Sequence, residues 1–242
     1  MGTLYIISTP IGNLEDITLR ALRVLKEADL ILCEDTRVTG KLLSHYGIRA
    51  PTLSYHQHSR LERVGEIARL LAEGKNLALV TDAGTPGISD PGNELVAEIV
   101  RQMRDVKVVP IPGPSALTAV ASIAGFPMDR FTFFGFPPAK KGRKKFFEQI
   151  AQSEYPVVFY ESPYRILKSL SELQTIRDTK YQIQDTRVVV GRELTKKFEK
   201  VYRGTIAEVM KQLGGQEARG EFVVVVGPVR SKKLSVSADF SS

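Results

Sequence analysis

The sequence predicts an α/β protein with two domains, each built around its own β-sheet. The first observation is length, because 242 residues are enough for two hydrophobic cores. The second is a regular alternation of strand-like and helix-like segments through the first half of the chain. The third is a change near residue 113, after which the strand-like segments follow one another more closely.

The first half of the chain has the pattern of βα units. Strand-like runs lie at residues 3–9, 30–35, 52–56, 76–82 and 107–112, and helix-like runs lie at 17–28, 39–46, 59–74 and 93–103. Such alternation favours a mostly parallel sheet. Gly47 and Gly74 stand just past helix ends, and Pro114 after Gly113 is the expected first residue of another helix.

The second half predicts a mixed sheet. Strand-like runs lie at residues 131–136, 157–162, 187–193, 197–204 and 221–227, with helices expected at 164–174 and 206–213. The neighbouring runs 187–193 and 197–204 suggest an antiparallel hairpin. We place the domain boundary in the Pro- and Gly-rich stretch 112–115, giving domains 1–113 and 114–228. Residues 229–242 are polar without periodicity and are expected to form a mobile tail.

The charge balance favours an acidic partner. The chain has 34 Lys and Arg residues against 27 Asp and Glu, a net charge of +7. Five basic residues cluster in a loop that follows a predicted strand, where they are candidates for binding RNA phosphates: Lys140, Lys141, Arg143, Lys144 and Lys145. A solvated charged face is the alternative. The adjacent Phe146 and Phe147 are expected to anchor the next helix in the core.

Several features favour a cytoplasmic protein. No apolar run approaches the length of a membrane span, and the first residues resemble a β-strand rather than a signal peptide. The single cysteine, Cys33, cannot form an internal disulfide, which fits a reducing compartment.

The common cofactor and catalytic motifs are absent. No G-x-G-x-x-G follows the first strand, and the chain has neither a G-x-x-x-x-G-K-[ST] loop nor a G-x-S-x-G elbow. Only His56 and His58 could place two metal ligands on one strand face, and no third ligand is evident, so we expect no metal site.

The functional signal lies in loops that follow the predicted strands. They read STPIGNLEDIT, CEDTR, SYHQH, TDAGTPGISDPG and PIPGPSA in the first domain, and FYESPYR and GRELTK in the second. Parallel α/β sheets build their sites at the carboxyl ends of the strands, so the first five loops are expected to share one edge. Each loop alone could be a simple turn.

These motifs together resemble the tetrapyrrole methylase family, and within it a bacterial group that methylates small-subunit ribosomal RNA. The resemblance extends from the amino terminus to about Gly227. It implies two α/β domains with a cleft for S-adenosylmethionine between them, a homodimer, and transfer of a methyl group to the ribose 2′-hydroxyl of a cytidine in 16S rRNA. The first loop and Asp82–Gly84 depart from the porphyrin-type pattern, which argues against a porphyrin or corrin substrate.

The resemblance also implies which residues contact the cofactor. The glycine-containing loop after residue 79 would offer its main-chain groups at Asp82, Ala83, Gly84 and Thr85, because small residues allow close approach. The other implied contacts are Pro10, Ser115, Ala116, Tyr160 and Leu194.

Methyl transfer to an alcohol needs alignment first and a proton acceptor second. The candidate acceptors are Glu34, Asp35, Glu161 and Glu193, and the candidates for binding phosphate or a developing oxyanion are Arg37, Arg165 and Lys196. The sequence does not single out one base. The alternative is a set of Arg–carboxylate pairs that join the two domains. Tyr55, Tyr164 and Arg165 are candidates for stacking on RNA bases.

Two other functions stay open at this point. One keeps the cofactor and assigns a tetrapyrrole-type small-molecule substrate. The other is a non-catalytic module that binds rRNA during ribosome assembly.

Overall fold

The computed structural model describes residues 1–55, 60–90, 92–181, 183, 185–214 and 219–229. The chain divides into two units, Met1–Thr118 and Ala119–Ser242. Helix α5 (Ala116–Ile123) spans the division, which therefore falls a few residues after the expected boundary at 113. The expected mobile tail lies outside the described residues, apart from Val229.

The first unit contains a wholly parallel five-stranded sheet. Its strands are β1 (Thr3–Ile7), β2 (Leu30–Cys33), β3 (Thr52–Ser54), β4 (Leu77–Leu79) and β5 (Lys107–Ile111), in the order β3-β2-β4-β1-β5. The predicted mostly parallel sheet is thus confirmed. The strand order brings the loops after β1, β2 and β4 to one sheet edge.

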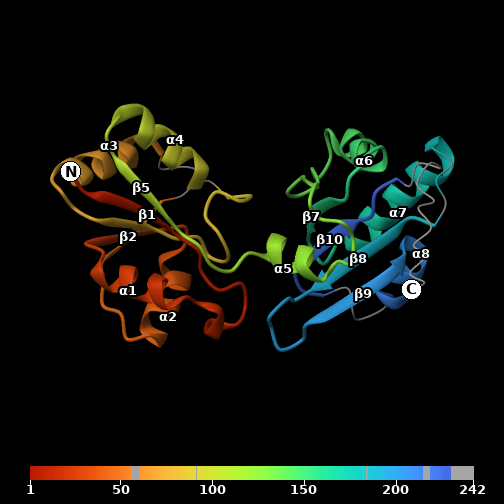
Figure 1. The fold of residues 1–242 in the computed structure, drawn as a ribbon, viewed down its shortest axis with the longest axis horizontal. Helices are drawn as coiled ribbons and strands as arrows, with labels where there is room; N and C mark the ends of the chain where they lie inside the picture. Colours follow the sequence, from red (N-terminus) through yellow and green to blue (C-terminus); the bar gives the residue numbers. More distant parts are fainter. Residues whose placement is uncertain (56–59, 91, 182, 184, 215–218, 230–242) are drawn as a thin grey trace, which may run out of the picture. The chain divides into compact units, whose positions relative to one another are not determined.

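Helices cover both faces of this sheet (Figure 1). Helices α1 (Leu19–Glu27) and α2 (Thr36–His45) pack on the face that includes Ile31. Helices α3 (Arg60–Ala72) and α4 (Gly92–Gln102) pack on the opposite face with Leu32. Because successive strand residues point to opposite faces, neighbouring apolar residues of β2 enter two different cores. A short 3₁₀ helix, η1 (Leu14–Asp16), lies in the loop after β1.

The second unit contains a mixed sheet of five strands. These are β6 (Thr132–Phe133), β7 (Val157–Glu161), β8 (Arg187–Arg192), β9 (Lys200–Thr205) and β10 (Phe222–Val226), in the order β6-β7-β10-β8-β9. Strands β6 and β7 are parallel, and the other pairs are antiparallel. The predicted β8–β9 hairpin in a mixed sheet is confirmed.

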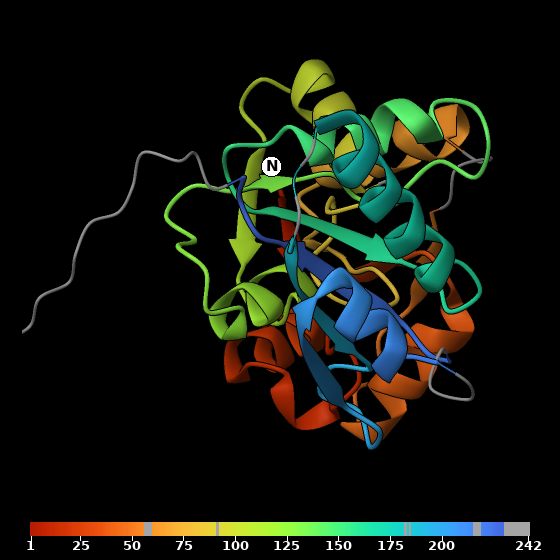
Figure 2. The same cartoon turned by 90° about the vertical axis from the view of Figure 1, so that its right-hand side faces the viewer.

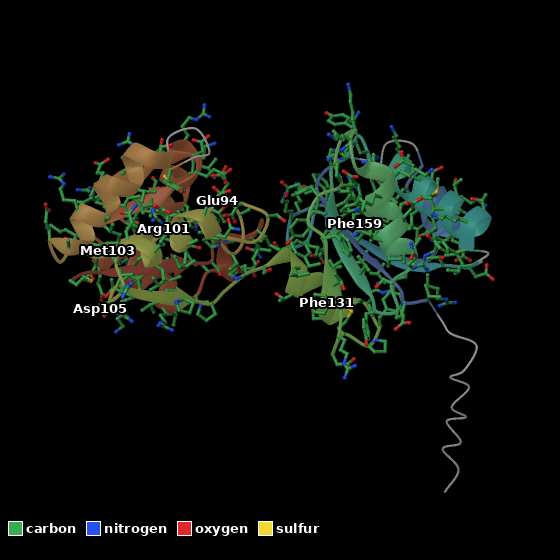
Figure 3. All side chains as sticks on the ribbon, turned by 90° about the horizontal axis from the view of Figure 1, so that it is seen from above. Glu94, Arg101, Met103, Asp105, Phe131 and Phe159 are labelled. Carbon is green, nitrogen blue, oxygen red and sulfur yellow. The ribbon has the colours of Figure 1, made fainter. Side chains whose placement is uncertain are left out.

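One face of this sheet carries the helices of the second unit. Helices α6 (Arg143–Ala151), α7 (Ile166–Ile176) and α8 (Ile206–Gln212) share one core with the sheet (Figure 2), and a π-helical turn, η2 (Arg177–Tyr181), continues α7. Phe159 of β7 lies inside this core, whereas Phe131 is exposed (Figure 3). Phe146 and Phe147 are buried, as the sequence predicted for the start of α6.

The start of α5 differs from the prediction. The helix begins at Ala116 rather than Pro114, because residues 113 and 114 belong to a loop that contacts the end of β1. A Cβ atom on Gly113 would lie 3.0 Å from Ser8 Cβ, and the Pro114 carbonyl accepts a hydrogen bond from Thr85 Oγ1 at 3.2 Å. The chain therefore turns here before it can start a helix.

Candidate functional site

The loop after β4 is hydrogen-bonded to the loop after β1. Thr9 N–H donates to Gly84 O at 2.9 Å, and Gly84 N–H donates to Thr9 O at 3.0 Å. Thr9 Oγ1 also donates to the Thr81 carbonyl at 3.1 Å. Gly84 has φ +87°, a left-handed conformation that favours glycine. Both main-chain groups of Gly84 are already paired with Thr9, and the expectation that Gly84 contacts the cofactor stays a prediction.

The far end of the same loop is held by the side chain of Asp90, which belongs to the loop. Asp90 accepts hydrogen bonds from Gly87 N–H at 2.8 and 2.9 Å and from Gly92 N–H, at the start of α4, at 2.7 Å. Asp82 and Ala83 lie between Thr81 and Gly84, the two residues held by Thr9, and are exposed. The described part of the chain offers no hydrogen-bond partner to their main-chain groups. This short segment is therefore the part of the loop that can bind a ligand through its backbone.

Thr85 joins three loops at this sheet edge. Its Oγ1 donates to Pro114 O, and its contact of 2.8 Å with Ser8 Oγ is then a hydrogen bond donated by Ser8. Ser115 and Ala116, which follow, are half-buried, and Pro10 is buried. Ser8 and Thr9 were not predicted to belong to this arrangement. Two adjacent hydroxyl residues at the end of a strand were the feature of the sequence that could have indicated it.

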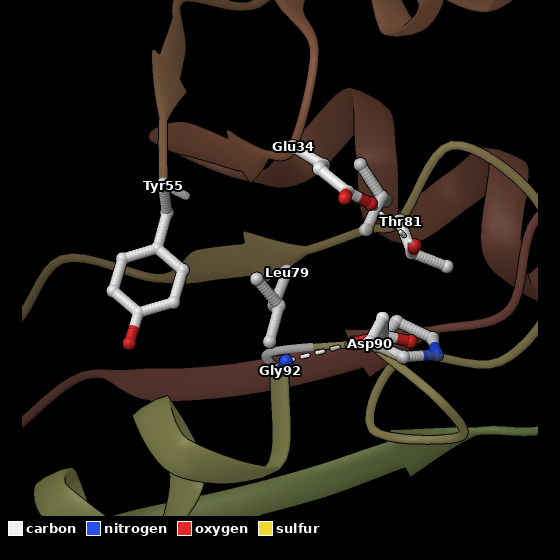
Figure 4. A pocket seen from close by; sticks show the side chains of 8 residues that line it. Glu34, Tyr55, Leu79, Thr81, Asp90 and Gly92 are labelled. Atoms are coloured by element: carbon white, nitrogen blue, oxygen red, sulfur yellow. Dashed lines mark hydrogen bonds between the residues drawn. The ribbon is translucent and has the colours of Figure 1, made fainter. Parts of the chain in front are cut away.

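A shallow hollow opens beside this loop. Its volume is about 210 Å³, including space open to solvent, and it is lined by Glu34, Tyr55, Leu79, Val80, Thr81, Pro86, Asp90 and Gly92 (Figure 4). The ring of Tyr55 is buried, so the hypothesis that it stacks on an RNA base is wrong. Asp90 and Thr81 escaped the sequence analysis because nothing in the sequence indicates which loop residues turn toward a neighbouring strand.

Glu34 is one of two carboxylates that line this hollow, and Asp90 is the other. Glu34 Oε2 accepts a hydrogen bond from Thr81 Oγ1 at 3.2 Å. Burial raises the pKa of Glu34, and the charge of nearby Asp82 raises it further, while the hydrogen bond from Thr81 opposes these effects. A raised pKa makes this carboxylate a better proton acceptor than an ordinary glutamate.

Asp35 is held by the neighbouring Arg37. Hydrogen bonds from the side chain and main chain of Arg37 lower the pKa of Asp35 to about 2. Asp35 N–H donates to Asp82 Oδ1 at 3.2 Å, whereas burial raises the pKa of Asp82. A strongly acidic, paired carboxylate such as Asp35 is a poor base. The carboxylate of Asp82 thus connects its own loop to the loop after β2.

In the second unit, Glu161 is enclosed by cations and hydroxyls. Only 1% of its surface is exposed, and it pairs with Arg165 Nε at 3.1 Å and Arg143 Nη1 at 3.9 Å. Ser162 N–H donates to it at 2.7 Å, and Ser169 Oγ donates to its other oxygen. The expectation that Glu161 lies at an open site as a proton acceptor is wrong. Arg165 is committed to the same cluster.

Glu193 is also bound by a cation and a main-chain N–H of the second unit. Burial raises its pKa, but the Glu221 N–H at 2.7 Å and Lys196 Nζ at 3.0 Å outweigh burial, so that the pKa is lowered. The ammonium of Lys196 also pairs with Glu221 at 2.8 Å. The pairs observed for Asp35, Glu161 and Glu193 each lie within one unit. The alternative that Arg–carboxylate pairs join the two domains stays a prediction.

The other implied cofactor contacts in the second unit stay predictions. Leu194 is 8% exposed, and its side chain covers Gly191, where a Cβ atom would lie 3.0 Å from Leu194 Cδ2. Tyr160 is half-buried between Phe133 and Phe136, at ring distances of 5.0 and 5.3 Å.

The basic cluster is smaller than the sequence suggested. Lys140, Lys141, Lys144 and Lys145 are exposed. Arg143 is 6% exposed and donates to Glu172, Ser169 and the Pro138 carbonyl. Its assignment to a phosphate-binding surface is wrong, because its guanidinium is turned inward and already occupied. We call the four exposed residues the lysine cluster.

Within the residues that the structure describes, no three His, Cys, Asp or Glu side chains are arranged to hold a metal ion. His56 and His58 lie outside these residues. No helix in the same residues is long and apolar enough to cross a membrane.

The fold and these loops define a family. The model of the tetrapyrrole (corrin/porphyrin) methylases matches residues 3–210, and the chain belongs to this family. A solved cobalt precorrin-4 methyltransferase has the same fold, with a TM-score of 0.63, 23% identity, and coverage of 93% of this chain and 94% of its own.

Two relatives place the chain more narrowly. A Synechocystis protein named ribosomal RNA small subunit methyltransferase I is 45% identical over 93% of this chain and 79% of its own length. A Thermotoga maritima protein of the same name is 45% identical over 93% of this chain and 98% of its own length. The chain therefore groups with proteins of that name inside the family.

The methyl donor of the family is S-adenosylmethionine. The first unit suits this molecule in two respects. Exposed main-chain groups at Asp82 and Ala83 can bind its polar parts, and the carboxylates of Glu34 and Asp82 would stabilise a sulfonium or amino group bound beside them. The residues present therefore fit the cofactor.

Proposed function

We propose that the protein methylates the ribose 2′-hydroxyl of a cytidine in 16S rRNA, with S-adenosylmethionine as methyl donor. The observation that carries the proposal is 45% identity over almost the whole chain to relatives named for small-subunit rRNA methylation. The net charge of +7 and the exposed lysine cluster support a polyanionic substrate. A corrin or porphyrin substrate is supported by the likeness of fold alone.

In this proposal the first unit binds the cofactor through its loops. The main chain of Asp82 and Ala83 contacts the donor, Thr85 and Ser115 support this surface, and the carboxylate of Asp82 balances positive charge. The bound donor supplies an electrophilic methyl group. Alignment of that group with the ribose oxygen is worth about 7 to 11 kcal/mol of barrier reduction when the geometry is good.

Glu34 is the proposed proton acceptor. Among the four carboxylates considered, Glu161 is enclosed, and the pKa values of Asp35 and Glu193 are lowered by bound cations or N–H groups. Only Glu34 combines exposure with a raised pKa. A general base typically contributes about 10² to 10⁴ in rate, so Glu34→Gln should lower kcat within that range at saturating cofactor.

The lysine cluster is the proposed phosphate-binding surface. Replacing Lys140, Lys141, Lys144 and Lys145 by Gln should weaken RNA binding and flatten its salt dependence. Each lost phosphate contact lowers the slope of log affinity against log salt by about 0.7 for single-stranded RNA. Arg143→Gln is not a substitute for this test, because it would disturb the interior. Weaker RNA binding with an unchanged salt slope would argue against direct phosphate contacts.

The activity is tested with labelled cofactor and small ribosomal subunits. A methyl group on the ribose oxygen blocks alkaline cleavage at that position, so the product should contain one labelled, alkali-resistant dinucleotide with cytidine on its 5′ side. Label on a base, or no label in rRNA, would refute the proposal. Catalytically dead enzyme is the control for contaminating activities.

We also propose a homodimer in the cytoplasm, for which sedimentation and cell fractionation are the tests.

A further inference from the structure

Two exposed aromatic side chains flank one hydrogen bond in the second unit. Arg165 Nη1 donates to the Pro137 carbonyl at 3.3 Å. Tyr164, next to Arg165, is 96% exposed, and Phe136, next to Pro137, is 52% exposed. The Phe136 ring lies 5.3 Å from that of Tyr160. The hydrogen bond therefore joins the two segments that carry these exposed aromatic side chains, which are distant in sequence and contribute little to the core.

The backbone beneath this surface is fixed from inside. Arg143 Nη1 donates to the Pro138 carbonyl at 3.2 Å, directly after the carbonyl that Arg165 binds. Both guanidiniums pair with the enclosed carboxylate of Glu161. Two consecutive carbonyls are thus held by two arginines that share one counterion. A surface held in this way loses little conformational entropy on binding, which favours affinity.

The lysine cluster begins two residues beyond the fixed carbonyls. Lys140 is therefore within about 8 Å of Pro138, since consecutive Cα atoms are about 3.8 Å apart. Both Lys140 and Lys141 are exposed. Exposed aromatic rings next to cationic side chains match the chemistry of single-stranded RNA, in which a base stacks on the ring and its phosphates bind the cations.

We propose that Tyr164 and Phe136, together with Lys140 and Lys141, form a platform that stacks an unpaired RNA base and binds the adjoining phosphates. The inference rests on the proposed RNA substrate and adds the site that selects unpaired RNA. Tyr164 is the principal stacking residue, because nearly its whole side chain is free to meet a base. Arg143, which is buried, and Arg165, which is half-buried, act through the backbone.

The test measures binding of a 12-nucleotide RNA that carries one 2-aminopurine, without cofactor, by anisotropy and by quenching of the 2-aminopurine. Tyr164→Ala should weaken binding of the single strand roughly 5- to 150-fold and reduce quenching, the range expected for one stacked base. Tyr164→Phe keeps the ring and should retain both signals. The same RNA annealed to its complement should bind both variants equally.

Tyr155→Ala is the matched control, because Tyr155 is another exposed tyrosine of the second unit, 43% exposed. It should leave binding unchanged. The platform is refuted if wild type does not bind the single strand, if Tyr164→Ala binds as wild type does, or if duplex binding falls equally. Methyl transfer is scored separately: a Tyr164-dependent quench without rRNA methylation refutes the proposed activity only, and methylation without such a quench refutes the platform only.

Discussion

Replacing Glu161 by Gln should destabilise the second unit strongly. The carboxylate is 1% exposed and faces Arg143 and Arg165, and it accepts hydrogen bonds from Ser162 and Ser169. The amide of Gln would direct N–H donors at guanidiniums that also only donate. Removing one partner of a buried ion pair costs about 3 to 5 kcal/mol, which corresponds to a fall in Tm of roughly 10 °C.

The assay is thermal and urea denaturation of Glu161→Gln, followed by methyl-transfer kinetics well below its Tm. Glu172→Gln is the control, because Glu172 also pairs with Arg143 at 2.7 Å but its side chain is 32% exposed. Losing the charge of Glu172 should lower the free energy of unfolding by about 1 kcal/mol or less. If Glu161→Gln kept wild-type stability and lost most of kcat, the carboxylate would be a catalytic base and the reasoning from its enclosure would be refuted.

Two further predictions concern the first unit. Asp82→Asn removes a charge that raises the pKa of Glu34, so the acidic limb of kcat against pH should move to lower pH at saturating cofactor. An unmoved limb would mean that Glu34 is not the titrating base. Ala83→Trp should lower cofactor affinity in calorimetry without changing Tm, because Ala83 is exposed. Gly84→Ala should instead cost about 1 to 2 kcal/mol of stability, since Gly84 has φ +87° and pairs with Thr9. A lower Tm for Ala83→Trp with unchanged cofactor affinity would contradict the role given to Ala83.

The sequence predicted the fold well because periodicity is a local signal. Alternating βα segments led directly to a parallel sheet, and two adjacent strand-like runs led to the β8–β9 hairpin. The helix start at Pro114 was wrong for a non-local reason. That loop is held by a hydrogen bond from Thr85, which is distant in sequence.

The roles of individual site residues were harder to predict from the sequence. Arg143 stands within a run of lysines, and only the packing of α6 against α7 turns it inward toward Glu172 and Ser169. Gly84 was singled out because a small residue lets a ligand approach the main chain, whereas its left-handed conformation and its pairing with Thr9 appear only in the structure. Charge and glycine content are visible in a sequence, whereas the partner that satisfies a buried group depends on tertiary structure.

The two units carry opposite charge where the proposed ligands bind. Glu34 and Asp82 place negative charge at the loops of the first unit, and the lysine cluster places positive charge on the second. A sulfonium donor is therefore attracted to the first surface, and RNA phosphates are attracted to the second. The RNA backbone is expected to be held mainly at the lysine cluster. Since counterion release governs phosphate binding, added salt should weaken RNA binding steeply while cofactor affinity changes little.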